Sequence, residues 1–220
     1  MILHMDVVAS FCVGWSETLV GYPFVTAKVL LQNGRSWRQP LLHYYRGVKY
    51  PLMNSVGFNM LVFPVHARLY KDWGHVGAGA VAGLLVSPQV FFVDTFTIRR
   101  QTNQSVSLSM FRGSRGLGMT FAREVLAMGT YFGTYYRVRD GANSFVAGGC
   151  AGLANWTLTF PLDTLRTRQI AQRCSVSEAL SQGRLWRGYG FAASRSVLVN
   201  AVSFSVYERV LRYIRGSGFS

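Results

Sequence analysis

The stretch from Phe145 to Arg168, FVAGGCAGLANWTLTFPLDTLRTR, gives the clearest indication of how the chain folds. Its first 18 residues, through Leu162, carry no charge, and Pro161 comes just before Asp163 and Arg166. Eighteen uncharged residues are close to the length that an α-helix needs to cross a hydrocarbon layer of about 30 Å. Asp163 and Arg166 are three positions apart and therefore project from one face of a helix. The stretch predicts a membrane helix that ends in an acid and a base beside a proline.

The same landmarks recur three times along the chain. A proline lies late in each of three apolar stretches, nine positions after a glycine, and an Arg-Gly pair follows each proline. The prolines are 65 and 73 residues apart, and the Arg-Gly pairs are 69 and 72 apart. Such a period indicates repeats. Each unit predicts a helix kinked by proline, a polar loop and a second helix. The landmarks are Gly14, Pro23, Arg46 and Gly47, then Gly79, Pro88, Arg115 and Gly116, then Gly152, Pro161, Arg187 and Gly188.

The composition favours a membrane protein. Half of the 220 residues are hydrophobic and only 15% are charged, against about 25% in a typical soluble domain. The length suits about six membrane helices of roughly 25 residues each. We expect a single all-α transmembrane domain over 1–220, with helices at 5–31, 44–71, 75–99, 112–139, 143–170 and 187–214. These pair into repeats at about 5–71, 75–139 and 143–214.

The net charge of +14 does not indicate a nucleic-acid partner. The basic residues gather in the loops inside the repeats, whereas the links around Lys71-Asp72 and Arg139-Asp140 are nearly balanced. Positively charged loops tend to stay on one side of a membrane, so we expect the three long loops in one compartment and both termini opposite.

The chain offers no sign of an enzyme or a metalloprotein. Three cysteines form no CxxC pair and four histidines lack ligand spacing, so neither a cofactor nor a metal is expected. There is also no nucleophile–base grouping or glycine-rich phosphate loop in the sequence.

Pro161-Leu-Asp163-Thr-Leu-Arg166 matches the Pro-x-Asp/Glu-x-x-Lys/Arg motif of mitochondrial carriers, and the whole chain resembles that family. The copy at Pro23 to Lys28 is partial, and the third keeps little beyond Pro88. The resemblance implies a monomeric, multi-pass solute transporter with threefold pseudo-symmetry and alternating access, usually in the mitochondrial inner membrane and often an antiporter. Peroxisomal and plastid members share the fold, so the organelle stays open.

The resemblance also implies a gate on the matrix side of the cavity. Charged residues beside the kinking prolines Pro23, Pro88 and Pro161 pair around the axis in the family. Carried over by position, Lys28 meets Asp163, and Gln32 stands where the family often braces that bridge.

Other gate positions have lost their charges. Val25 and Val93 replace an acid and a base, and an apolar contact in place of a buried ion pair can be nearly neutral in energy. Arg166 would meet an acid at Val90; Asp94 nearby could substitute for it. The opposite gate holds no acid–base pair in the family arrangement, its positions being Ala67, Tyr136 and Glu208 with Tyr70, Arg139 and Leu211; Tyr70 and Glu208 could hydrogen-bond.

The candidate substrate site lies seven residues after the glycine of each Arg-Gly pair, at Asn54, Arg123 and Arg195. Charges at mid-membrane depth are expensive and mark function, and the family binds substrate at these positions. Arg123-Glu124 and the following Tyr-Phe-Gly resemble carnitine and ornithine carriers, which implies an amino acid or related zwitterion or carboxylate. Alternatively, Arg123 and Glu124 form a structural network and Arg195 alone meets substrate.

Two further readings stay open. The weak gates are compatible with a non-transporting homologue that acts as a membrane interaction protein, or with a nucleotide or keto-acid carrier. Arg46-Gly47 and Arg187-Gly188, each after an aromatic residue, resemble the cardiolipin-binding turns of the family. Ordinary interfacial anchoring by aromatic and basic side chains is the alternative there.

Overall fold

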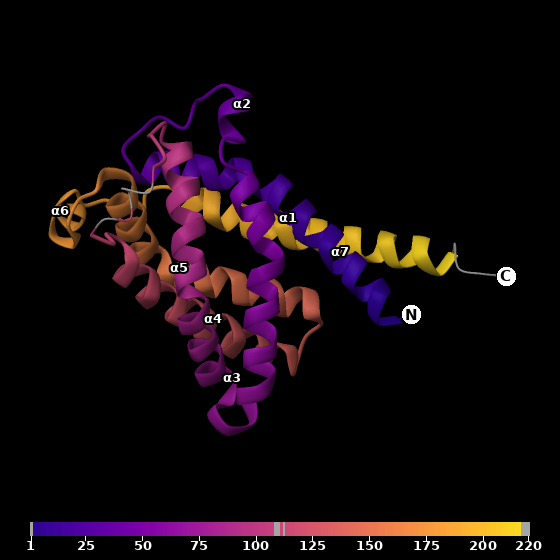
Figure 1. Cartoon of the computed structure of the whole chain (residues 1–220). Helices are drawn as coiled ribbons and strands as arrows, with labels where there is room; N and C mark the ends of the chain where they lie inside the picture. The colour runs from indigo at the N-terminus through magenta and orange to yellow at the C-terminus, as the bar shows by residue number, and fades with distance from the viewer. Residues whose placement is uncertain (1, 108–110, 112, 217–220) are drawn as a thin grey trace.

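The computed structural model describes residues 2–107, 111 and 113–216, and within these residues every regular element is a helix. Figure 1 shows α1 and α7 running side by side, with α2 and α6 toward one end of the molecule and both termini away from it. The helices are α1 (Ile2–Gln32), α2 (Leu41–Tyr44), α3 (Lys49–Gln101), α4 (Leu117–Arg139), α5 (Ser144–Gln172), α6 (Val176–Ser181) and α7 (Tyr189–Gly216).

Helix α3 is two helices joined at a sharp bend. Gly74 has φ 65° and ψ 173°, outside the helical region, and Figure 1 shows the chain turning back there so that the two legs of α3 lie next to each other. The expected helices 44–71 and 75–99 are these two legs. Pro23, Pro88 and Pro161 all lie inside helices, in α1, α3 and α5.

The glycine of each Arg-Gly pair ends a loop rather than opening a helix. Gly47, Gly116 and Gly188 have φ of 85°, 91° and 94°, the left-handed region that favours glycine. The helices therefore begin after them, at Lys49, Leu117 and Tyr189. The starts expected at 44, 112 and 187 were too early, because sequence hydrophobicity does not reveal this backbone reversal.

Each of these glycines also touches a helix of another unit. A Cβ at Gly47 would lie 3.1 Å from Arg100 Cβ in α3, and one at Gly116 would lie 2.8 Å from Ile170 in α5. A Cβ at Gly188 would lie 3.3 Å from the Lys28 carbonyl oxygen in α1. The loops inside the three units are thus packed in turn against the next proline-bearing helix.

Helices α3 and α4 approach so closely that glycine is required between them. A Cβ at Gly83 would lie 2.3 Å from the Glu124 carbonyl oxygen, and one at Gly79 would lie 2.5 Å from that of Met128. This contact fixes the height of Glu124 against α3.

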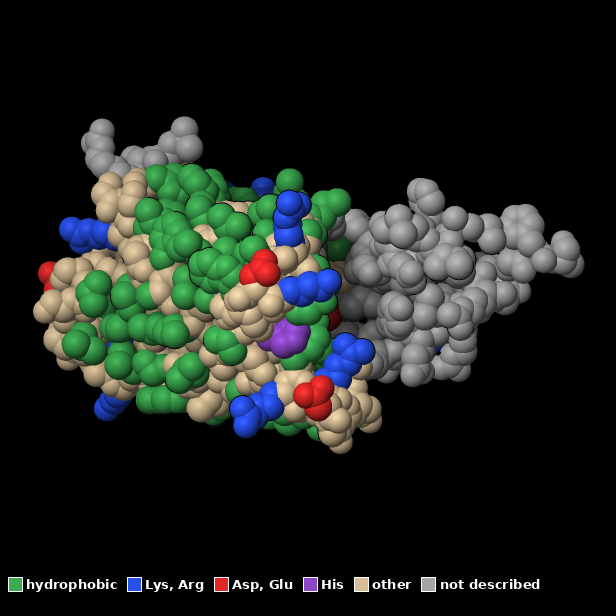
Figure 2. All heavy atoms as spheres, turned by 90° about the horizontal axis from the view of Figure 1, so that it is seen from below, with side chains coloured by type: hydrophobic (Ala, Val, Ile, Leu, Met, Phe, Trp, Pro, Cys, Tyr) green, Lys and Arg blue, Asp and Glu red, His purple; other side chains and the backbone are tan. Residues whose placement is uncertain are grey.

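Apolar side chains both fill the interior and cover the outside. One buried cluster, with Val29, Phe91 and Ile170, joins α1, α3 and α5, and a second, with Val86 and Phe132, joins α3 and α4. Figure 2 shows hydrophobic side chains over much of the face that it draws. Among the described helices, the stretch Met60–Gln101 is long and apolar enough, by length and composition, to cross a membrane.

Candidate substrate cavity and gate

A cavity of about 260 Å³ lies among five helices. Its wall includes all four residues predicted to bind substrate, which come from different elements: Asn54 from α3, Arg123 and Glu124 from α4, and Arg195 from α7. The cavity is lined also by the charged residues Lys28, Asp94, Asp163 and Arg166.

A buried ion-pair network around Asp163 lines part of the cavity. Lys28 Nζ lies 2.8 Å from Asp163 Oδ2, and Gln32 Nε2 donates a hydrogen bond to the same oxygen at 2.9 Å. Gln32 also donates to Thr164 Oγ1 at 3.1 Å. The side chain of Asp163 is completely buried and that of Lys28 is 7% exposed. Such a pair is costly to break because the remaining charge would be buried without a partner.

Arg166 connects this network to the predicted substrate site. Its guanidinium lies 2.8 Å from Asp94, 3.1 Å from Asp163 and 3.4 Å from Glu124. Asp94 lies one helical turn beyond Val90, the position at which the motif would place an acid. The sequence motif does not predict the contact between Arg166 and Glu124, because this contact depends on how closely α4 packs against α5.

Two of the three acids around this arginine, Glu124 and Asp94, differ in accessibility. Glu124 is 1% exposed and bonds to Arg123 as well as Arg166, whereas the Asp94 side chain is 29% exposed. Asp94 is therefore the more accessible of these two carboxylates.

Two neighbours of the predicted site were missed by reasoning from the sequence. Trp156 in α5 has the Lys28 ammonium 4.6 Å and the Arg123 guanidinium 5.3 Å from its ring centroid, within the range of cation–π attraction. Gln89 Nε2 donates to Asn54 Oδ1 at 2.6 Å and so orients that amide. A polar or aromatic residue within a few positions of a kinking proline was the only available signal.

Arg195 reaches the cavity across α1. A Cβ on Gly21 would lie only 2.7 Å from Arg195 Nε, so the absence of a side chain there makes room for the arginine. Glu17, also in α1, attracts Arg195 electrostatically.

The outer gate positions are only partly described. Tyr70 and Tyr136 lie near each other through ring contacts with His75, at centroid distances of 5.4 and 3.7 Å. The side chains of Glu208 and Leu211 lie outside the described residues, as does the Tyr70–Glu208 hydrogen bond that the sequence suggested.

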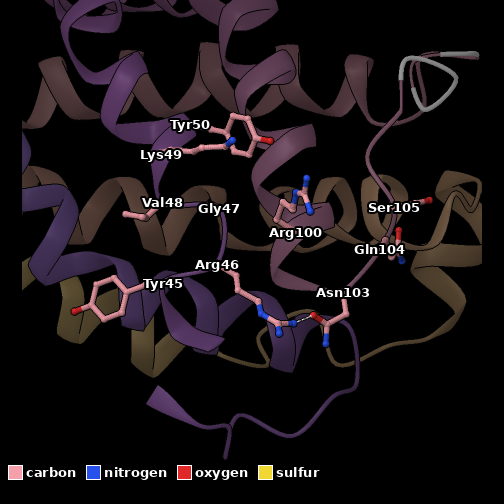
Figure 3. A pocket seen from close by; sticks show the side chains of 10 residues that line it. All are labelled: Tyr45, Arg46, Gly47, Val48, Lys49, Tyr50, Arg100, Asn103, Gln104 and Ser105. Atoms are coloured by element: carbon pink, nitrogen blue, oxygen red, sulfur yellow. Dashed lines mark hydrogen bonds between the residues drawn. The ribbon is translucent and has the colours of Figure 1, made fainter. Parts of the chain in front are cut away.

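A basic pocket of about 720 Å³ lies where the first Arg-Gly pair meets the end of α3. Figure 3 shows Arg46 reaching Asn103, to which it hydrogen-bonds, with Lys49 and Arg100 nearby. Arg187, beside Gly188, lines a second pocket of about 660 Å³ with Trp186. Both pockets combine positive charge with aromatic surface.

Comparison with known proteins agrees with this geometry. A family profile described as "Mitochondrial carrier protein" matches residues 139–182. The mitochondrial arginine transporter BAC2 of Arabidopsis thaliana is 30% identical over 220 aligned residues, covering 76% of this chain and 73% of that protein. The chain belongs to the mitochondrial carrier family. Membership makes it a membrane transport protein of the mitochondrial inner membrane rather than an enzyme.

Two human carriers are also similar. The mitochondrial basic amino acids transporter is 26% identical, covering 97% of this chain and 92% of its own length. Solute carrier family 25 member 45 is 25% identical, covering 94% of this chain and 99% of its own. The first alignment runs over 281 positions, more than the 220 residues of this carrier, so the relative holds segments that this chain lacks.

Proposed function

We propose that the protein carries an amino acid, or a related zwitterion or carboxylate, across the inner membrane by alternating access around the cavity of Asn54, Arg123, Glu124 and Arg195. Three two-helix repeats, at about 5–71, 75–139 and 143–214, would surround that cavity as six tilted membrane helices. The observation that carries the proposal is a small cavity lined both by the guanidinium groups of Arg123 and Arg195 and by the buried ion-pair network around Asp163.

The cyclic packing of the three Arg-Gly glycines supports the threefold arrangement. The loop of the first unit contacts the proline-bearing helix of the second, that of the second contacts the third, and that of the third returns to the first. A ring of equivalent contacts is what pseudo-threefold symmetry requires.

The chemistry of the cavity suits an amino acid. A planar guanidinium binds a carboxylate through two hydrogen bonds, and Arg195 and Arg123 supply it. The exposed part of Asp94 and the face of Trp156 suit a cationic group. At about 260 Å³ the cavity lies below the ~300–1,000 Å³ of sites for drug-sized ligands, which argues against a nucleotide. Relatives named for arginine and basic amino acids put these solutes first.

The network of Lys28, Asp163, Arg166 and Gln32 would be the matrix gate, with the kinking prolines beside it. Alternating access requires that the gate open after substrate binds, so the substrate must interact better with an intermediate state than with the closed one. Arg166 offers a way to open the gate, because a cationic solute bound to Asp94 or Glu124 would compete with Arg166 for these carboxylates.

Anionic lipid would bind at the two pockets with exposed basic and aromatic side chains, around Arg46-Gly47 and Arg187-Gly188. Cardiolipin is the lipid that the family resemblance implies. The backbone amides at the start of α3 and α7 add to the attraction for phosphate.

The test is uptake of labelled arginine, lysine, ornithine, carnitine, keto acids and nucleotides into liposomes that contain the purified protein. We expect exchange of a basic amino acid and its loss, by at least tenfold, in Arg195→Ala. The matched control is Arg38→Ala, which removes an arginine from the exposed loop before α2 and should leave uptake unchanged.

Three outcomes would contradict the proposal. Uptake that survives Arg195→Ala would remove the assigned site. If folded protein, with a cooperative unfolding transition, takes up none of the solutes, the result would favour a non-transporting membrane interaction protein. Uptake of a nucleotide or keto acid in place of an amino acid would favour a nucleotide or keto-acid carrier.

A further inference from the structure

Two of the four histidines converge at the bend of α3. His66 is near the end of the first leg and His75 directly follows Gly74, and His75 Nδ1 lies 3.3 Å from His66 Nε2. Nine positions along a straight helix would not bring two rings together. The reversal at Gly74 does so, and no part of the proposed substrate site uses them.

The separation of the two nitrogens fits a shared metal ion. Zinc binds imidazole nitrogen at about 2.0–2.1 Å with tetrahedral angles, so two such ligands lie roughly 3.3–3.4 Å apart. The ring planes of His66 and His75 differ by only 17°, and the contact between the two nitrogens turns one nitrogen of each ring toward the other. Metal binding needs neutral rings with both facing nitrogens unprotonated, so the ring that now donates a proton would carry it on its other nitrogen.

Aromatic rings from α4 hold the two imidazoles in place. Phe132 stacks on His66 with centroids 3.9 Å apart, and Tyr136 stacks on His75 at 3.7 Å. Tyr70 lies beside both histidines, at 6.0 and 5.4 Å. Ligands whose orientation is fixed before binding lose little entropy when the ion arrives.

The pair is accessible from one side. His66 is 4% exposed, whereas His75 is half-buried, and Figure 2, seen from the end that contains the bend, shows a histidine reaching the surface among Lys, Arg, Asp and Glu side chains. An ion could therefore enter beside His75 and keep its remaining positions for water.

We propose that His66 and His75 form a binding site for a divalent cation of the zinc class at the end of the carrier opposite α2 and α6. Imidazole suits Zn²⁺, Cu²⁺ and Ni²⁺, and oxygen-preferring Mg²⁺ and Ca²⁺ would not bind. The ion would tie the two legs of α3 to each other beside Tyr70 and Tyr136, which stand at outer gate positions. Inhibition of transport by the ion rests on the proposed function, whereas binding of the ion does not.

The first experiment measures binding in the full-length protein in detergent. Zn²⁺ should raise the unfolding temperature saturably and reversibly on chelation, because a ligand that binds only the folded state stabilises it. Mg²⁺ should give no shift. His66→Phe and His75→Phe keep the stacked rings but remove the nitrogens, and each should abolish the zinc shift. His43→Phe, at a histidine remote from the bend, should retain it.

The second experiment adds Zn²⁺ to the outside of loaded liposomes, where at least a fivefold loss of uptake is expected in the wild type and none in His75→Phe. His75→Asn serves if a phenylalanine variant does not fold. The proposal is wrong if Zn²⁺ gives no thermal shift in the wild type, or if the shift persists in either phenylalanine variant. A thermal shift in a protein that transports nothing would uphold the site while refuting the proposed function.

Discussion

At the scale of single residues, Asp163 makes the most contacts in the proposed gate. Its completely buried carboxylate forms ion pairs with Lys28 and Arg166 and accepts a hydrogen bond from Gln32. Asp163→Asn would keep the shape but leave two buried cations short of a partner, and breaking a buried pair in this way costs about 3–5 kcal/mol. We expect a corresponding fall in the free energy of unfolding, measured by denaturant titration in detergent.

Asp94→Asn is the control for this prediction. Its side chain is 29% exposed, and Arg166 would still touch Asp163 and Glu124 after the change. The fall in the free energy of unfolding should be clearly smaller for Asp94→Asn than for Asp163→Asn. Equal losses would mean that burial and shared pairing do not determine the strength of the network.

The sequence predicts some of these contacts and not others. The motif sets Lys28 opposite Asp163 by counting from the prolines, and the two side chains lie 2.8 Å apart. For Arg166 the sequence suggested Asp94, which lies 2.8 Å away, but counting fails for the contact with Glu124, which depends on helix rotation and separation. It fails for His66 as well, because its contact with His75 exists only through the bend at Gly74.

At the scale of helices, the approach of α3 to α4 is set by glycine. The Cβ of Gly83→Ala would meet the Glu124 carbonyl oxygen at 2.3 Å, and backbone on both sides must move apart. Overpacking of this kind costs about 1–3 kcal/mol. We expect that loss of stability together with weaker substrate binding, since Glu124 would be shifted, and both can be measured by thermal unfolding with and without substrate.

Gly149→Ala is the matched change in a helix. A Cβ at Gly149 in α5 meets nothing within 4 Å, and alanine favours a helix over glycine by about 0.8–1.0 kcal/mol. This variant should be as stable as the wild type or slightly more so. A Gly83→Ala variant that behaves in the same way would show that the close contact is not needed.

Helix positions follow from hydrophobicity, but the helix starts do not. Long apolar stretches separated by basic loops predict where helices lie. The starts at Lys49, Leu117 and Tyr189 depend instead on the left-handed glycines just before them. The glycine of each Arg-Gly pair is therefore needed for the left-handed backbone of the loop. Composition alone would place that glycine inside the helix that follows.

At the scale of the whole molecule, the substrate site and the gate form one charge network. Arg166 joins Glu124 in α4 to Asp163 in α5, and Asp163 joins Lys28 in α1. Sequence motifs describe the site and the gate separately, because they occur in different helices and at different intervals. Only the packing of α1, α4 and α5 brings them within reach of one arginine.

A double-mutant cycle between Lys28→Met and Glu124→Gln tests this connection. Each single change leaves one buried charge in excess, of opposite sign, and the double change restores the balance. We therefore expect the double variant to lose less stability than the sum of the singles, by roughly 0.5–3 kcal/mol, although the two residues share no direct ion pair. Lys28→Met with Glu178→Gln, an exposed acid in α6 that caps its own helix, should be additive to within about 0.5 kcal/mol. Additivity in the first cycle as well would mean that Arg166 does not couple the cavity to the gate, and that substrate binding must open the carrier by another route.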